Sequence, residues 1–243
     1  MMLEFLNCQV ERLDRVDSTN NRLKELAAAG APEGTALVAR EQTAGRGTGD
    51  RTFFSPAGEG VYLSVLLRPR VPAEELLTLT GWAAAAVREA IEKACGAPCQ
   101  IKWLNDIYLN GKKLCGILAE LSPTLDWVVV GIGVNLTQTA DTFRTQRLGD
   151  IATSLAAEGF FVTEEELARA LLAELEEMYR RFPGDREEYL SRYRTHCVTV
   201  GRTVEYHENG KLYRGNACGI DDSFALVVEG PEGRRAVRSG RVL

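Results

Sequence analysis

The chain has 243 residues and a mass of 26.7 kDa, with 45% hydrophobic and 26% charged residues and a mean hydropathy of −0.15. This composition is globular and excludes disordered, collagen-like and coiled-coil proteins. The net charge of −5 gives no general attraction to nucleic acid or anionic membranes, so any anion site must be local. No apolar run approaches the ~20 residues that span a bilayer, and residues 1–5 lack the order of a signal peptide, which predicts a cytoplasmic protein.

The six cysteines and two histidines limit the possible chemistry. The cysteines form no C-x-x-C pair and their spacing does not supply a zinc site, so we expect buried, reduced thiols. Both histidines, His196 and His207, lie near the C-terminus. A Ser-His-Asp or Cys-His mechanism within the first 195 residues is therefore excluded.

In chain order, apolar patterns and turn residues predict a mixed sheet with helices. Ser18 caps a first helix, and Pro72 opens a long second helix that ends near Gly96. Asn110–Gly111 marks a hairpin, and Thr163 begins a capping box before a further helix. We expect strands at residues 3–13, 35–39, 61–67, 107–109, 113–118 and 127–134, and a last helix at 185–194.

From Val198 the pattern changes to short strands separated by turns at 209–210, 221–222 and 230–233, which is typical of a small β-barrel. The hairpin signal argues against a purely parallel sheet. We therefore expect an α+β fold, with a mixed β-sheet and flanking helices over residues 1–195 and a small barrel domain over residues 196–243.

Residues 42–60 form a long loop with five glycines, and long loops in compact domains are usually functional. Its first part, residues 42–51, combines glycines, whose backbone N–H groups can approach a ligand, with Arg46 and Arg51, which can bind phosphate oxygens. The segment is a candidate phosphate-binding loop, and an ordinary flexible loop is the alternative. It matches neither the Walker nor the Rossmann pattern.

Lys102, Asn105 and Asp106 place a cation, an amide and a carboxylate at the end of a short strand. A lysine can neutralise phosphate charge, and an aspartate can hold Mg²⁺ together with phosphate oxygens. A surface turn with an ion pair is the alternative. Lys113 and its neighbour Lys112 follow the hairpin turn, where they could equally protect an edge strand.

Residues 131–135 end a strand with two glycines and Asn135, and such glycines let a ligand approach the backbone. Taken in chain order, this and the earlier segments resemble the biotin protein ligases. The segments that carry the resemblance are Asp17–Asn20, Glu41–Gly47, Phe54–Pro56, Lys102–Asp106, Lys113–Glu120 and Gly131–Asn135. The resemblance extends from Val16 to Leu136, and beyond Leu136 it concerns only architecture, namely helices and a small SH3-like barrel.

The resemblance implies a class II synthetase-like biotin/lipoate ligase domain and a two-step reaction. Biotin and MgATP would form biotinyl-5′-adenylate with loss of pyrophosphate, and a lysine of a biotin carboxyl carrier domain of a carboxylase would then attack to give an amide. No covalent enzyme intermediate is implied, so positioning and charge neutralisation would carry the rate. The chain starts at the first catalytic strand, without the helix-turn-helix of some members. We therefore expect no DNA binding, no membrane partner, and a monomer or weak homodimer.

Carried over by motif position, the implied site residues fall into three groups. The catalytic residues would be Lys113, at the biotin carboxylate, with Arg46 and Lys102 facing the phosphates. Biotin would contact Ser18, Thr19, Asn20, Gln42, Gly45, Arg46, Gly47, Thr48, Lys113 and Gly116. The nucleotide would contact Arg51, Phe53, Asn105, Asp106, Ile117 and Asn135, and Asp106 would also hold magnesium.

Two departures from the family pattern lie in these segments. Thr48 stands where the family has a basic residue, so one phosphate-binding cation is missing. Leu104 replaces the proline of the family's K-W-P-N-D pattern. Two other functions stay open: a lipoate or octanoate transferase, whose fatty chain would need a less polar pocket than residues 18–20 and Gln42 provide, and a biotin-binding module without ligation activity.

Overall fold

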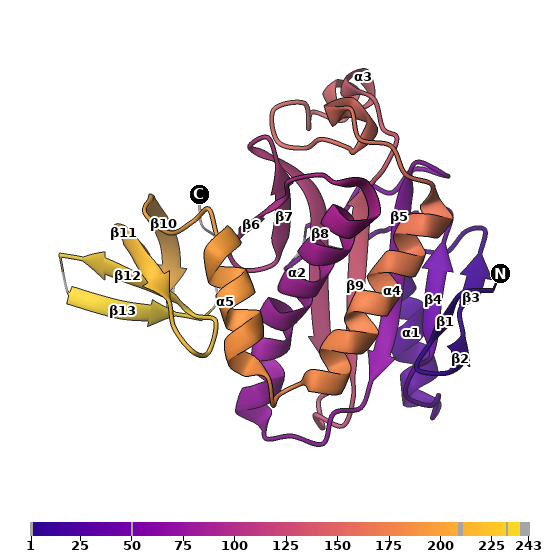
Figure 1. Cartoon of the computed structure of the whole chain (residues 1–243), viewed down its shortest axis with the longest axis horizontal. Coiled ribbons are helices and arrows are strands. Elements are labelled where there is room, and N and C mark those ends of the chain that lie inside the picture. Colours follow the sequence, from indigo (N-terminus) through magenta and orange to yellow (C-terminus); the bar gives the residue numbers. More distant parts are fainter. Residues whose placement is uncertain (1, 50, 209–210, 232, 239–243) are drawn as a thin grey trace.

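A mixed seven-stranded sheet forms the centre of the molecule, and it confirms the expected α+β architecture (Figure 1). The computed structural model describes residues 2–49, 51–208, 211–231 and 233–238. The strand order is β3-β4-β5-β9-β8-β7-β6, in which only β3 and β4 are parallel neighbours among the described residues. The strands are β3 (Glu11–Leu13), β4 (Ala36–Ala39), β5 (Gly60–Leu67), β6 (Gln100–Lys102), β7 (Asp106–Leu109), β8 (Lys112–Leu121) and β9 (Val128–Asn135).

Helices cover the two faces of this sheet unequally. The long helices α2 and α4 lie across one face with α5 beside α2, whereas the short helix α1 packs on the other face against β4, β5 and β9 (Figure 1). The helices are α1 (Thr19–Ala28), α2 (Ala73–Cys95), α3 (Ala140–Thr145), the 3₁₀ helix η1 (Ala156–Glu158), α4 (Glu164–Arg181) and α5 (Arg186–His196).

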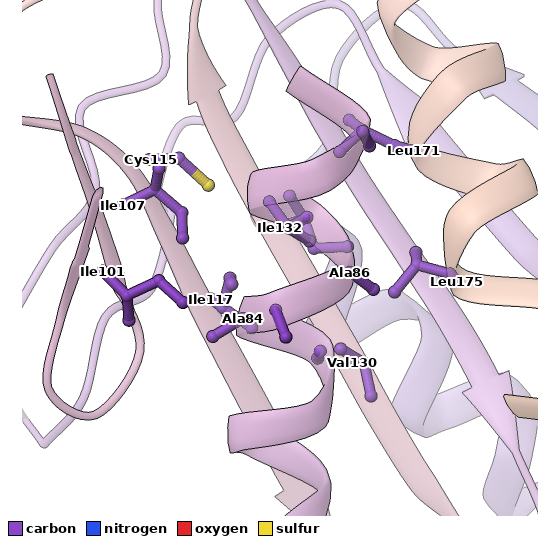
Figure 2. Close-up of a cluster of buried hydrophobic side chains, with 14 of the residues drawn as sticks. Ala84, Ala86, Ile101, Ile107, Cys115, Ile117, Val130, Ile132, Leu171 and Leu175 are labelled. Carbon is purple, nitrogen blue, oxygen red and sulfur yellow. The ribbon is translucent and has the colours of Figure 1, made fainter. Parts of the chain in front are cut away.

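The alternation of side chains along β9 determines which face stays open. Val130 and Ile132 enter the core beneath α2 and α4, part of which Figure 2 shows. On the opposite face Val129 packs against α1, and Gly131 and Gly133 come next along the strand. Because glycines carry no side chain, this face of the sheet has room for a site beyond the start of α1.

Local signals in the sequence correctly located several element ends. Ser18 caps α1 by accepting a hydrogen bond from the backbone N–H of Asn21, and Thr163 forms a complete capping box at the start of α4. Asn110 and Gly111 have φ angles of 49° and 79°, the left-handed pair that a tight two-residue hairpin requires. These predictions rest on side chains within one turn of the backbone they control.

Two expectations for the chain outside the main sheet were wrong or incomplete. The strand expected at residues 3–13 is divided by a hairpin between β1 (Glu4–Phe5) and β2 (Cys8–Gln9), because Leu6 and Asn7 both have positive φ. No element was predicted between residues 137 and 162, where α3 and η1 form. The pair Leu6–Asn7 contains no glycine, and α3 and η1, with six and three residues, are too short to show an apolar period.

The C-terminal residues form a separate four-stranded antiparallel meander beside α5 (Figure 1). In chain and sheet order its strands are β10 (Thr203–Glu208), β11 (Lys211–Ile220), β12 (Leu226–Gly230) and β13 (Gly233–Val237). In the described residues β10 and β13 do not pair with each other, so the sheet is not a closed barrel there. The turn expected at 209–210 and residue 232 of the turn at 230–233 lie outside the described residues.

All six cysteines are free thiols, as expected. Burial was expected for all of them, and the structure buries Cys99, Cys115 and Cys197 but leaves Cys218 exposed on the outer surface of β11. None of the helices in the described part of the chain combines the length and the apolar character that a membrane crossing requires.

Candidate active site

A network of buried polar side chains lies where α1 begins, on the glycine-bearing face of the sheet. The backbone N–H and hydroxyl of Thr19 donate to Gln42 Oε1 at 2.9 and 3.0 Å. Ser64 of β5, which is fully buried, has its hydroxyl 2.7 Å from Thr19 Oγ1 and 2.6 Å from Asn20 Oδ1. Gln42 Nε2 in turn donates to Ser55 Oγ at 2.9 Å. The expected biotin-binding polar groups are therefore oriented by one another before any ligand arrives.

Glu120 of β8 connects this network, through Asn20, to two further side chains, Lys24 and Arg46. Its carboxylate accepts from Lys24 at 2.8 Å and from Asn20 Nδ2 at 2.9 Å, and it pairs with Arg46 at 3.0 Å. Burial by itself would raise the pKa of Glu120, but the hydrogen bonds from Lys24 and Asn20 and the charges of Lys24 and Arg46 lower it below its usual value. Glu120 therefore holds Arg46 against the pocket wall.

A β-bulge directs Lys113 toward the same face as Gly116. The pairing of β7 with β8 shifts register so that Tyr108 faces Lys113 while Ile107 faces Cys115, which leaves Leu114 as the extra residue. Without that extra residue, Lys113 and Gly116 would lie on opposite faces of the sheet, because residues three apart in a regular strand face opposite sides.

Lys113 Nζ lies 2.6 Å from Asp106 Oδ1. Its backbone pairs with a loop from the next part of the chain, donating to the Ile151 carbonyl at 2.8 Å. The neighbouring Lys112 points elsewhere and donates to the Gly149 carbonyl at 2.8 Å. The choice of Lys113 rather than Lys112 as a candidate site residue agrees with this geometry.

Glycines form the floor of the site, but most of them make room for protein side chains. A Cβ at Gly133 would come within 2.5 Å of the Phe53 ring, and one at Gly131 within 1.9 Å of Asn20 Oδ1. Gly116 lies under both Lys113 and Phe53. Gly45 was expected to let the backbone approach a ligand; instead, a Cβ there would meet the Phe53 carbonyl oxygen at 2.4 Å, so this glycine packs the loop against itself.

Two connected cavities lie over this floor. The smaller, of about 90 Å³, is enclosed by α1, the loop after β4 and strands β8 and β9. The larger, of about 920 Å³, opens between the main sheet and the C-terminal sheet, and its volume suits a ligand of nucleotide size. The residues that line both are Arg51, Thr52, Phe53, Asn105, Asp106 and Lys113.

Most of the expected site residues line these cavities. In the smaller cavity the expected biotin residues are Ser18, Thr19, Asn20, Gln42, Arg46, Gly47, Thr48, Lys113 and Gly116, and Gly45 is not among its lining. The larger cavity adds Lys102 and Asn135. Ile117 lines the smaller cavity, but its side chain is 1% exposed and packs in the core (Figure 2), so it offers the cavity its backbone only.

The turn expected to face the nucleotide is held by specific hydrogen bonds. Asn105 exchanges backbone and side-chain hydrogen bonds with Ile117, and its Nδ2 lies 3.3 Å from Thr48 Oγ1. Lys102, the register partner of Asp106 in the hairpin, lies over the Tyr108 ring at 5.3 Å from the centroid. Burial and the nearby Asp106 charge raise the pKa of Tyr108, so this ring stays neutral beneath the lysine at physiological pH.

Several residues of the site were missed in the sequence. Ser64 could have been found as a polar residue inside an apolar strand. Glu120 ends the resembling segment Lys113–Glu120 but was given no role there. The loop containing Phe143 and Ile151 had no signal, because it joins the site only through tertiary structure. The same holds for Arg202, which reaches the larger cavity from the C-terminal sheet.

The residues present fit a magnesium ion that is held mainly by a nucleotide. Among the described residues no group of three or more His, Cys, Asp or Glu side chains could hold a metal ion alone. Asp106 and Asp150 are the carboxylates of the larger cavity. Mg²⁺ in nucleotide sites takes one or two protein carboxylates together with phosphate oxygens, so this donor set is sufficient.

A polar pocket that shares Lys113 and five other lining residues with a nucleotide-sized cavity defines the class of site, and the comparisons define the family. The model of the biotin/lipoate A/B protein ligase family matches residues 13–135. The chain is 37% identical over 234 residues to the bifunctional ligase/repressor BirA of Bacillus spizizenii, covering 94% of this chain and 72% of that protein.

Two further relatives match almost end to end. The chain is 34% identical to the biotin–[acetyl-CoA-carboxylase] ligase of Paracoccus denitrificans, over 95% of this chain and 98% of that protein. The solved structure of the biotin protein ligase from Aquifex aeolicus in complex with biotin and ATP has a TM-score of 0.83 and 31% identity, over 96% of this chain and 97% of that one. The chain belongs to the biotin/lipoate A/B protein ligase family.

Proposed function

We propose that this protein is a biotin protein ligase that forms biotinyl-5′-AMP from biotin and MgATP and then transfers biotin to a lysine of a biotin carboxyl carrier protein. The observation that carries the proposal is the junction of the two cavities at Lys113. Biotin would place its ureido head in the small pocket and its carboxylate at this junction. There the carboxylate would meet a nucleotide that enters through the large cavity.

In the first step a carboxylate oxygen of biotin attacks the α-phosphorus of ATP. The bond between that phosphorus and the bridging oxygen to the β-phosphate breaks, and its electron pair leaves with pyrophosphate. Lys113, Arg46 and Lys102 bring positive charge to the reacting oxygens. Because Lys113 pairs with Asp106 and Arg46 with Glu120, both cations are held in place in advance, which is the arrangement that preorganised electrostatic catalysis requires.

In the second step the amine of a carrier lysine attacks the acyl carbon, the bond to AMP breaks, and the amine loses a proton. No histidine lines either cavity in the described part of the chain, so positioning of the two substrates carries this step. The ureido head of biotin would bind among Ser18, Thr19, Asn20 and Gln42, with Gly47, Thr48 and Gly116 along its chain, since a buried polar head needs hydrogen-bond partners.

The nucleotide would lie in the larger cavity. Arg51 would bind its phosphates, Phe53 and Asn135 would contact the base, and Ile117 would offer only backbone atoms. Asn105 would contact ATP, and Asp106 would hold the magnesium ion that neutralises phosphate charge. Asp106 also pairs with Lys113, so this carboxylate would lie beside both the lysine and the ion.

Other parts of the proposal rest on the sequence and the family together. They are a division into domains at residues 195 and 196, closure of the C-terminal sheet into an SH3-like barrel, and a carrier domain of acetyl-CoA carboxylase or a related carboxylase as acceptor. A cytoplasmic location, the absence of DNA and membrane partners, and a monomer or weak homodimer rest on the sequence alone.

The polarity of the small pocket favours biotin over the fatty chain of lipoate or octanoate. Ser18, Thr19 and Asn20 are all buried there, and an alkyl chain would leave their spare hydrogen-bonding capacity unpaired. A non-catalytic binding module would need no second cavity lined by Lys102 and Arg51.

Exchange of labelled pyrophosphate into ATP separates these functions. A biotin ligase exchanges label only when biotin is present, and it then biotinylates a carrier domain. Exchange that depends on lipoate or octanoate would assign the protein to that transferase class, and biotin binding without exchange would leave only a binding module.

A further inference from the structure

The larger cavity has a wall that comes from the C-terminal sheet, and this wall is fixed to the segment that carries Lys102. The backbone N–H of Trp103 donates to Thr199 Oγ1 at 2.9 Å, and its indole N–H donates to the Phe224 carbonyl at 2.9 Å. The Phe224 ring packs so closely on α2 that a Cβ at Gly81 would come within 2.3 Å of it. The C-terminal wall therefore keeps a defined position relative to the site.

Arg202 projects from this wall just before β10. Its backbone N–H donates to the Thr199 carbonyl at 3.3 Å, and its carbonyl accepts from Ala217 at 2.9 Å, so the main chain of Arg202 is held on both sides. Its side chain is exposed and makes no ion pair with any residue that the structure describes. By contrast Arg186 and Arg194 on the neighbouring helix α5 pair with Glu75 and Asp222.

Charge in the larger cavity is unbalanced. Among the described lining residues, four cationic side chains face two carboxylates: Arg51, Lys102, Lys113 and Arg202 against Asp106 and Asp150. One carboxylate, Asp106, is already paired with Lys113. A cavity with this excess of positive charge suits a polyanion, because guanidinium groups bind phosphate oxygens in a planar fork.

We propose that Arg202 binds the β- and γ-phosphates of ATP, and hence the departing pyrophosphate. The proposal rests on the proposed function. The α-phosphate must lie at the junction of the two cavities, where the biotin carboxylate attacks it. Arg202 lines only the larger cavity, so it meets the part of the triphosphate that leaves. When the bond between the α-phosphorus and the bridging oxygen breaks, its electron pair goes to pyrophosphate, and Arg202 stabilises that added charge.

The test is equilibrium binding of ATP and AMP to the full chain without biotin, so that no turnover occurs. Arg202→Ala should weaken ATP binding about tenfold, the size of one exposed charge-assisted hydrogen bond, and change AMP binding less than about twofold, because AMP lacks the β- and γ-phosphates. Arg202→Lys should recover part of the loss. Arg214→Ala, which removes an exposed arginine of β11 outside both cavities, should bind ATP like the unaltered protein.

Three results would overturn the assignment. An equal loss of affinity for ATP and AMP would place Arg202 at the adenosine or show that the variant is misfolded. Unchanged ATP binding with a raised KM for the carrier domain would make Arg202 part of an acceptor surface. Weaker ATP binding in both Arg202→Ala and Arg214→Ala would show that the effect comes from net charge alone. If instead the unaltered protein bound ATP but showed no biotin-dependent exchange, the proposed function would fail while the phosphate contact could still be measured.

Discussion

The two cavities are built in different ways. Beside the smaller, buried side chains form hydrogen bonds with other protein side chains, as Thr19 does with Gln42 and Asn20 with Ser64. The larger takes walls from the main sheet, from the loop containing Phe143 and Ile151 and from the C-terminal residues, and it alone of the two is lined by the exposed Arg202. The difference indicates that the first cavity selects its ligand by fixed hydrogen-bond geometry, whereas the second attracts its ligand by charge and adapts to it.

Removing the lysine at the junction should have the largest effect. Lys113→Ala should keep the fold and lower biotin-dependent exchange by about 100-fold or more, because one preorganised charge at a transition state is typically worth that much. Lys112→Ala, in which the adjacent lysine is removed from outside the cavities, is the matched control and should retain full exchange. Equal exchange rates for Lys113→Ala and the unaltered protein would show that Lys113 does not take part in adenylation.

An arginine at position 48, where the family has a basic residue, should make the smaller cavity retain the adenylate longer. Thr48 lines the smaller cavity together with Arg46, Arg51 and Lys113, of which Arg46 is paired with Glu120 and Lys113 with Asp106, so an added cation should strengthen retention of an adenylate phosphate. A charge-assisted hydrogen bond is worth about 1.5–3 kcal/mol, so Thr48→Arg should slow release of preformed biotinyl-adenylate by about 10- to 100-fold and suppress labelling of bystander lysines.

The control for this change is Thr43→Arg, which adds the same charge to an exposed position of the same loop outside both cavities. The measurement is the dissociation rate of the adenylate from each protein. An unchanged rate in Thr48→Arg would mean that Arg51 or the loop backbone already retains the phosphate.

Removing one buried hydroxyl should affect the two ligands differently. Ser64→Ala leaves Asn20 Oδ1 without its close partner and removes one of two partners of Thr19 Oγ1, which keeps Gln42. This should weaken biotin binding about tenfold and leave ATP binding unchanged. Ser122→Ala, in the turn between β8 and β9, removes an equally buried hydroxyl far from either cavity. If calorimetry gave equal biotin affinities for the two variants, the fixed network would not select the ligand.

The smallest expected effect is on stability against acid. The pKa of Glu120 is lower in the folded protein than its usual 4.5, so Glu120 contributes stability above about pH 4.5 that is lost as pH falls through the folded value. Between pH 5 and pH 3 the free energy of unfolding should therefore fall by about 0.5–1 kcal/mol more in the unaltered protein than in Glu120→Gln. Glu25→Gln, at an exposed site on α1, should follow the unaltered protein. If the free energy of unfolding depended on pH in the same way in Glu120→Gln and in the unaltered protein, this prediction would be wrong.

The sequence predicted best what depends on neighbouring residues. The cap at Ser18, the hairpin at Asn110–Gly111 and the mixed sheet follow from local turn chemistry and alternation. The bulge that directs Lys113 could not be predicted, because register depends on the partner strand. The pairs Glu120–Lys24 and Ser64–Asn20 join residues far apart in the chain, so no periodicity reveals them.

The same distinction explains why two expected site residues are placed differently from what the motifs suggested. Ile117 lies within a motif of the family, but alternation along β8 turns its side chain into the core. The closeness of Gly45 to Phe53 and Ser55 is a property of the folded loop, which spacing alone does not contain. Arg202 is 89 to 151 residues from the other cations of its cavity, Arg51, Lys102 and Lys113, so only the packing of the C-terminal sheet identifies it.

A crystal structure with biotin and a non-hydrolysable ATP analogue would show directly which cavity binds which substrate. We expect the ureido ring to lie among Ser18, Thr19 and Gln42, with the biotin carboxylate within hydrogen-bond distance of Lys113 Nζ and the triphosphate in the larger cavity. Biotin bound in the opposite direction, or a triphosphate outside the larger cavity, would contradict the assignment of the two cavities to the two substrates.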